Sequence, residues 1–252
     1  MSTPSGTPDT PPDGDRRLAA RASRFAEVAL AHENNLVKVT KEIPFDKACL
    51  LGCGVVTGAG AVIRSAHIGV GHTVAIIGCG GVGLSAIQGA RMAGALRIIA
   101  VDLQPKKLEL ARSFGATDLV NPNDGDPVAQ VRALTDDYGV DAAIEIIGLT
   151  ETAAQALGMI NNGGNAYLVG VQKPGALMDF APGSIVTSQK GIKGIYMGST
   201  QFKVDIPMFA EYYLQGRFKL DELVSQTIPL EKVNEGYEDL KKGEVARSVV
   251  VF

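Results

Sequence analysis

The chain has 252 residues, of which 46% are hydrophobic, and a formal net charge of −3. This length and apolar content suffice for one large globular domain or two small ones, and the charge excludes a broad basic surface for nucleic acid. The three cysteines, Cys49, Cys53 and Cys79, do not match the disulfide framework of a secreted domain. No uninterrupted apolar stretch reaches the ~18 residues of a membrane span, so a cytoplasmic location is expected.

The first part of the chain is expected to contain little regular structure. Residues 1–24 are predicted to form a disordered tail, because 1–15 carry four prolines and no large apolar residue beyond Met1. The stretches "FAEVAL" (25–30) and "NLVKV" (35–39) are predicted to be short strands. A glycine-rich, cysteine-containing helix is predicted over 46–66.

A regular alternation of strands and helices follows. It predicts an α/β fold with a doubly wound parallel sheet, because strands that alternate with 10 to 15-residue helices form βαβ crossovers. After residue 200, two helical patterns (203–215 and 231–241) flank "SQTIPL", and "RSVVVF" closes the chain as a strand. The strands of the parallel sheet are expected at 73–78, 97–102, 118–121, 140–147, 165–171 and 192–197.

A glycine motif stands where the first of these strands meets a helix. Gly78, Gly80 and Gly83 form G-x-G-x-x-G, in which the glycines allow a sharp turn, room for a pyrophosphate and close packing of helix on strand. The helix N-terminus then offers free N–H groups and about half a positive charge to phosphates. The helix that follows has a face of small residues, expected to lie on the sheet: Val82, Ala86, Gly89, Ala90 and Ala93.

An acidic residue ends the second strand. Asp102 lies 19 residues after Gly83, where a carboxylate can accept hydrogen bonds from an adenosine ribose. The same carboxylate would repel a 2′-phosphate, so the sequence favours NAD over NADP. Lys106 and Lys107 leave NADP open, because either could neutralise the added charge.

Longer motifs carry a family resemblance. "HENNLVKV", "CLLGCGVVTGAG", "GCGGVGL", "GATDLVNP", "EIIG" and "NEGYEDLKKGEVARSVVVF" together resemble the zinc-dependent medium-chain alcohol dehydrogenases, in register from about residue 25 to 252. The resemblance implies a Rossmann fold and an NAD-linked oxidoreductase of alcohols or aldehydes, dimeric or tetrameric. It divides the chain into a remnant of the catalytic domain (25–52), an NAD-binding domain (53–198) and a C-terminal segment of the catalytic domain (199–252).

The resemblance also assigns site residues. Thr57 and Val82 match residues near the nicotinamide, and Thr57 is the candidate catalytic residue. Cys53 matches a thiolate ligand of the catalytic zinc. The remaining cofactor-binding candidates are the phosphate loop Gly78, Gly80, Gly81 and Gly83, the ribose contacts Asp102 and Lys107, and Ile147, Val169 and Arg247, of which Arg247 matches a basic residue on the pyrophosphate.

The metal site is incomplete in this sequence. Family members carry roughly another half-chain before these residues, which supplies the other zinc ligands and most of the alcohol pocket. A catalytic zinc needs about three protein ligands. Cys49 and Cys53 could share a helix face, but no histidine lies at ligand spacing beside them, and no general base can be assigned.

Two other functions stay open. The chain could be a non-catalytic NAD-binding or regulatory protein, since the glycine loop alone would serve that role. It could also be an S-adenosylmethionine methyltransferase, which shares the βαβ unit and the acid after the second strand.

The C-terminus predicts a homo-oligomer. Its apolar residues, Val249 to Phe252, would lack cover without the absent half of the family's chain, and exposed apolar residues favour association.

Overall fold

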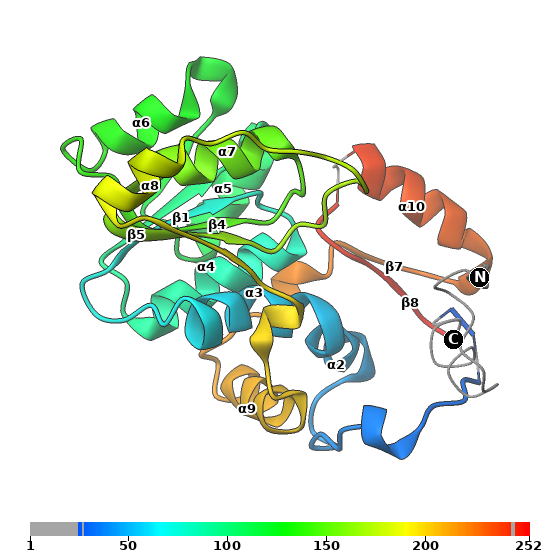
Figure 1. The fold of residues 1–252 in the computed structure, drawn as a ribbon. Helices are drawn as coiled ribbons and strands as arrows, with labels where there is room; N and C mark the ends of the chain where they lie inside the picture. The colour runs from blue at the N-terminus through cyan, green and yellow to red at the C-terminus, as the bar shows by residue number, and fades with distance from the viewer. Residues whose placement is uncertain (1–24, 27, 243–244) are drawn as a thin grey trace, which may run out of the picture.

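The computed structural model describes residues 25–26, 28–242 and 245–252, so the predicted tail at 1–24 lies outside the described residues. Its centre is a six-stranded parallel sheet in the order β3-β2-β1-β4-β5-β6 (Figure 1). This confirms the predicted doubly wound α/β fold. The strands are β1 (Thr73–Ile77), β2 (Arg97–Val101), β3 (Asp118–Val120), β4 (Val140–Glu145), β5 (Ile160–Leu168) and β6 (Gly191–Gly194).

Both faces of the sheet are buried. In β1, Val74 and Ile76 point to one core and Ala75 and Ile77 to the other, because successive side chains of a strand alternate. The first core is completed by α3 (Val56–Gly60), α4 (Gly81–Ala93) and α5 (Pro105–Phe114). The second is completed by α6 (Pro127–Ala133) and α7 (Thr150–Met159), while α8 (Pro182–Ser188) lies against β5.

The helical stretch predicted at 46–66 is one long helix. It runs through α2 (Phe45–Leu50), a π-helical turn η2 (Leu51–Val55), α3 and a second π-helical turn η3 (Ala61–Ser65). It has 21 residues, and an 18-residue window within it has a mean hydropathy of 1.5, so by length and composition alone the helix could cross a membrane. The expectation concerned uninterrupted apolar stretches, and here Asp46, Lys47 and Arg64 leave 16 uncharged residues in a row, 48–63. Leu51, Val55, Ala59 and Val62 are almost fully buried in the first core, as in a core helix.

The small-residue face of α4 packs on this helix and not on the sheet. A Cβ atom built on Gly89 would lie 3.0 Å from the Cα of Ala59, and one built on Gly58 would lie 2.0 Å from the carbonyl oxygen of Val82. The prediction that this face lies on the sheet was wrong, because periodicity reports which side of a helix is small but not which element covers it. Glycine and alanine here allow two helix backbones to approach each other.

The C-terminal region adds a small second sheet. The strands β7 (Gln226–Ile228) and β8 (Ser248–Val250) pair in parallel beside α10 (Val233–Lys242), apart from the main sheet (Figure 1). The helix α9 (Phe202–Leu214) lies against η2 and α3. The short 3-10 turns are η1 (Glu33–Asn35), η4 (Pro122–Asp124), η5 (Met197–Ser199), η6 (Asp221–Leu223) and η7 (Leu230–Lys232).

The two short strands predicted near the start are not formed. The described residues of 25–30 and the residues 35–39 make no strand pairing. Val28, Leu30 and Leu36 are exposed. A strand needs a partner to satisfy its backbone groups, and among the described residues no neighbouring strand reaches this segment.

An ion pair between the buried Asp205 and the exposed Arg64 joins α9 to the long helix, and it leads to a prediction about stability. Asp205 is fully buried; its Oδ1 accepts hydrogen bonds from Arg64 Nη2 (2.6 Å) and Nε (3.1 Å), and its Oδ2 from the N–H of Gln201 (2.8 Å). We expect Asp205→Ala to lower the free energy of unfolding by about 1–3 kcal/mol, because it leaves the N–H of Gln201 without its acceptor, while the exposed Arg64 can be solvated. Denaturant unfolding tests this.

The exposed pair of Glu238 and Lys241 provides the control. Glu238→Gln should leave the stability close to that of the wild type, because both side chains are solvated. Equal effects of Asp205→Ala and Glu238→Gln would contradict the role given to Asp205.

Candidate functional site

The glycine loop lies at the carboxyl ends of β1 and β4, where the strand order of the sheet reverses. Gly78 has φ +102°, and its N–H donates to the carbonyl of Val101 at 2.8 Å. A Cβ atom on Gly83 would lie 1.8 Å from the Gly78 carbonyl oxygen, so only glycine allows α4 to pack this close. Around Gly80, by contrast, there is open space for 4 Å. The loop therefore leaves bare backbone facing the crevice at the N-terminus of α4.

Asp102 holds this loop from the end of β2. Its Oδ2 accepts from the N–H of Cys79 (2.9 Å) and its Oδ1 from the N–H of Gln104 (3.0 Å). Each carboxylate oxygen keeps a lone pair that could accept from a ribose hydroxyl. Burial, with a contribution from Asp102, strongly raises the pKa of the Cys79 thiol, while nearby Lys107 acts to lower it. Cys79 is thus a protonated, structural thiol.

Arg247 reaches the same loop from the far end of the chain. A Cβ atom on Gly81 would lie 2.6 Å from Arg247 Nε, and one on Gly54 would lie 3.3 Å from Nη2. Burial lowers the pKa of Arg247 and the nearby Cys53 acts against this, but a guanidinium stays charged at neutral pH. No carboxylate of the described residues pairs with it. A half-buried cation without a counter-ion thus lies against the first turn of α4.

Glu145, which the sequence analysis missed, organises the facing side of the crevice. It ends β4 and is fully buried. Its Oε1 accepts from the N–H groups of Ile147 (2.7 Å) and Gly148 (2.7 Å) and from Thr152 Oγ1 (2.9 Å). Its Oε2 is buried and has no hydrogen-bond partner among the described residues. The only signal in the sequence was the acid of "EIIG" at the end of a strand.

The loop that Glu145 holds brings two predicted residues to the glycines. A Cβ atom on Gly78 would lie 2.9 Å from Cγ1 of Ile147. The N–H of Val169 donates to the Glu145 carbonyl at 2.8 Å. Ile147 and Val169 therefore follow β4 and β5 at the same edge of the sheet as the glycine loop.

Thr57 lies on α3, next to the helix that follows the glycines. The close approach of Gly58 to Val82 places Thr57 beside the first turn of α4. Its Oγ1 donates to the Sδ of Met197 at 3.8 Å. Met197, Gly198 and Ser199 all have positive φ (49°, 66° and 51°), and a Cβ atom on Gly198 would lie 2.1 Å from the carbonyl oxygen of Val56. This left-handed turn, which the sequence analysis missed, lies against α3.

The described residues do not complete a zinc site. No group of three or more histidine, cysteine or acidic side chains lies within reach of one metal ion in that part of the chain. Cys49 and Cys53 are exposed and Cys79 is buried in the glycine loop. Cys53 is therefore one candidate ligand where about three are needed. The residues that are described do not fit a catalytic zinc by themselves.

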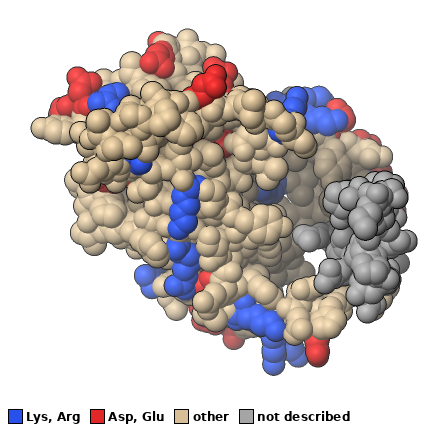
Figure 2. Space-filling view, viewed as in Figure 1, with Lys and Arg blue, Asp and Glu red and all other residues tan. Residues whose placement is uncertain are grey.

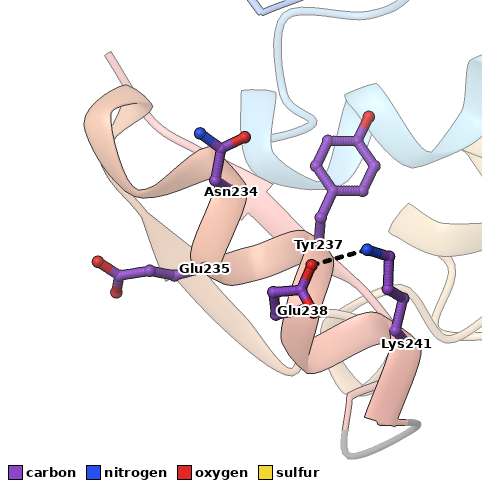
Figure 3. A pocket seen from close by; sticks show the side chains of 5 residues that line it. All are labelled: Asn234, Glu235, Tyr237, Glu238 and Lys241. Carbon is purple, nitrogen blue, oxygen red and sulfur yellow. Dashed lines mark hydrogen bonds and ion pairs between the residues drawn. The ribbon is translucent and has the colours of Figure 1, made fainter.

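A surface hollow along α10 lies apart from the glycine loop. A hollow of about 550 Å³ runs along α10 between Asn234, Tyr237 and Lys241, on the outer side of that helix (Figure 3). It contains the exposed pair of Glu238 and Lys241 and none of the predicted site residues. Uncharged residues cover most of the face in Figure 2, where Lys and Arg form only short runs.

Comparison with known proteins defines the class of protein. Residues 81–211, more than half of the chain, match the family "Zinc-binding dehydrogenase". The chain belongs to this family of zinc-binding medium-chain alcohol dehydrogenases.

Among curated relatives, it is 38% identical to Alcohol dehydrogenase 1 of Trifolium repens, over 90% of this chain and 60% of that protein. It is 39% identical to S-(hydroxymethyl)glutathione dehydrogenase of Haemophilus influenzae, over 91% and 61%. The chain thus spans about 60% of the length of these relatives.

Solved structures give the same fold. The structure of an alcohol dehydrogenase zinc-binding domain protein from Burkholderia ambifaria superposes with a TM-score of 0.83 and 39% identity, over 86% of this chain and 58% of that one. Benzyl alcohol dehydrogenase from Acinetobacter calcoaceticus superposes with a TM-score of 0.84 and 36% identity, over 87% and 60%.

Proposed function

We propose that this chain binds NAD in the crevice between β1 and β4 and is the coenzyme-binding part of an NAD-linked oxidoreductase of alcohols or aldehydes. The observation that carries the proposal is the bare backbone around Gly80, with the N-terminus of α4 on one side and unpaired Arg247 on the other. Both attract the charge of a pyrophosphate. Two further points support the proposal: the chain belongs to the zinc-binding dehydrogenase family, and the carboxylate of Asp102 favours NAD over NADP.

Each site residue has a part in this proposal. Backbone N–H groups of Gly80 to Gly83 and the Arg247 guanidinium would hold the pyrophosphate, and Asp102, with Lys107 nearby, the adenosine ribose. Ile147, Val169, Val82 and Thr57 would line the path to the nicotinamide. Bound NAD would supply the hydride acceptor, while the protein orients its ring and excludes water from one side.

The metal part of the family chemistry does not follow from the described residues. Among the described residues, Cys53 is the one candidate ligand and is so by resemblance alone, so no step is derived through zinc. The relatives are longer than this chain, and their activity on alcohols is extended to it only as part of the proposal.

Calorimetry with NADH, with metal analysis and an assay on the same sample, tests the proposal. We expect saturable NADH binding. Absence of binding by folded protein would refute the proposal. Alcohol-dependent NADH formation with added zinc would show that the chain is catalytic as it stands.

A non-catalytic NAD-binding protein is the second candidate. The observation that favours it is the absence of a three-ligand metal cluster among residues 25–26, 28–242 and 245–252. NADH binding without any alcohol-dependent turnover, with or without zinc, would select this function over the oxidoreductase. A methyltransferase would instead bind S-adenosylmethionine and not NADH.

Asp102 makes a prediction about coenzyme choice. We expect Asp102→Gly to weaken NADH binding by about tenfold or more and NADPH binding less, because the variant loses a charged acceptor for the ribose and its repulsion of a 2′-phosphate. Titration of both coenzymes against wild type and variant measures the ratio. Since Asp102 also accepts from Cys79 N–H, thermal melting must show that the variant is folded. An unchanged NADH to NADPH ratio in folded variant would rule out the ribose contact.

The chain is also expected to associate with itself. β6 is an edge strand with Ile192 partly exposed, and Val251 and Phe252 are exposed beyond β8, although Val249 is buried. An open edge and exposed apolar ends favour pairing of two copies. Sedimentation at tens of micromolar should show a dimer or larger oligomer; a monomer would contradict this. The cytoplasmic location stays a prediction.

A further inference from the structure

A second hollow lies at the opposite edge of the main sheet, at the amino ends of β4 and β5. It has a volume of about 280 Å³ and is lined by the linker after η3, the start of β4 and β5 from Asn161 to Tyr167. Nothing in the proposed coenzyme site uses it. Its polar groups are His72, Asp141, Asn161, Asn162, Asn165 and Tyr167.

Tyr167 is the first sign that this hollow is a binding site. The residue is only 7% exposed and its ring lies in the first core, yet it lines the hollow. Its hydroxyl makes no hydrogen bond to any described residue and is reached by solvent from the hollow, where a ligand could pair with it. Asn165 lies two residues earlier on the same strand and therefore on the same face of the sheet. A free hydroxyl and a free amide thus project into one space.

Asp141 gives the hollow its charge. Its Oδ2 accepts from the N–H (2.7 Å) and Oγ1 (2.9 Å) of Thr73, and its Oδ1 accepts from Asn161 Nδ2 at 2.8 Å. Burial acts to raise the pKa of Asp141, but the hydrogen bonds from Thr73 and Asn161, with a contribution from nearby His72, outweigh it and hold this pKa below its ordinary value. The carboxylate is therefore ionised at neutral pH, and Oδ1 keeps a free lone pair.

The lining favours one class of ligand. No lysine or arginine is among the lining residues, and Asp141 is the one acidic side chain there. Phosphates and carboxylates would meet Asp141 without a counter-charge. We propose that this hollow binds a small organic cation that carries an amide or hydroxyl group, with its ammonium at Asp141 and its polar group at Tyr167 and Asn165. The volume of the hollow is at the small end of known ligand pockets, so the ligand must be a small molecule.

Three small amides that differ in charge test this proposal. Glycinamide is mostly protonated at pH 7, propionamide carries a methyl in place of the ammonium, and malonamate carries a carboxylate. Each is titrated into the full chain, and the backbone and side-chain amide signals are followed by NMR. We expect saturable shifts at residues 161–165 with glycinamide and none with the other two.

Tyr167→Phe provides the variant, since it removes only a hydroxyl without a protein partner and should fold normally. It should weaken glycinamide binding by about three- to tenfold. Tyr196→Phe, which removes an exposed hydroxyl elsewhere, should leave binding unchanged.

Several results would overturn the proposal. Stronger binding of malonamate would show an anion site, and equal shifts with all three amides would show non-specific contact. Undiminished glycinamide binding in Tyr167→Phe would remove the hydroxyl from the site. The absence of shifts with all three would mean that only water fills the hollow. None of these results depends on NADH binding at the other edge of the sheet.

Discussion

Gly58→Ala is expected to lower the free energy of unfolding by about 3 kcal/mol or more, and the melting temperature by about 6–12 °C. The added Cβ atom would lie 2.0 Å from the Val82 carbonyl oxygen, 2.8 Å from the N of Ala86 and 2.9 Å from the Cβ of Ser85. Backbone atoms cannot rotate away as a side chain can, so α3 and α4 must separate. Because the first turn of α4 would hold the pyrophosphate in the proposed site, NADH binding should weaken as well.

Gly52 offers a matched control in the same long helix. A Cβ atom there would meet nothing within 4 Å, and Gly52 is exposed. Gly52→Ala should therefore be neutral or raise the stability by up to about 1 kcal/mol, because alanine is a better helix former. Thermal melting of both variants checks the pair. Melting temperatures within about 1 °C of each other would show that the helices do not depend on the close contact.

Arg247→Gln should weaken NADH binding by about ten- to a hundredfold while leaving the stability of the unliganded protein unchanged or slightly higher. The guanidinium is half-buried, has no carboxylate partner among the described residues and lies near the positive end of the α4 dipole. In the unliganded protein this charge is unfavourable, and a bound pyrophosphate would make it favourable. The substitution should therefore weaken NADH binding while the stability of the unliganded protein stays the same or rises.

Calorimetry and thermal melting measure these two effects. Arg112→Gln is the control for net charge, because Arg112 is exposed on α5 and, within the described part of the chain, its ion pair is with exposed Glu109. It should bind NADH like the wild type. If Arg247→Gln also binds NADH with wild-type affinity, the pyrophosphate does not lie at Arg247. A marked fall in the stability of Arg247→Gln would mean that the arginine serves the fold instead.

The local sequence pattern was sufficient to predict the strands and helices of the central parallel sheet. The predicted strands of the main sheet and the helices after residue 200 match the observed elements closely, with ends that differ by a few residues. The turn from β1 into α4 could also be predicted, because it depends on the close contact between Gly78 and Gly83, which are near each other in the chain. Contacts of short range leave a signature in residue type and spacing.

Pairings between distant segments could not be read in the same way. Two apolar stretches near the start were expected to be strands, but strand formation depends on a partner that local pattern does not reveal. The small face of α4 was recognised, yet only the structure shows that α3 covers it. Arg247 was placed at the phosphate by resemblance alone.

By itself, the sequence determined the α/β class, the glycine loop and the acid at the end of β2, because each depends on backbone conformation and on neighbours along the chain. Only the tertiary structure decided that Glu145 clamps the facing loop, that Met197 to Ser199 form a left-handed turn on α3, and that Tyr167 and Asp141 share a hollow. The reason is physical: side-chain burial and unpaired polar atoms arise from packing between segments, and periodicity in one segment does not specify the other.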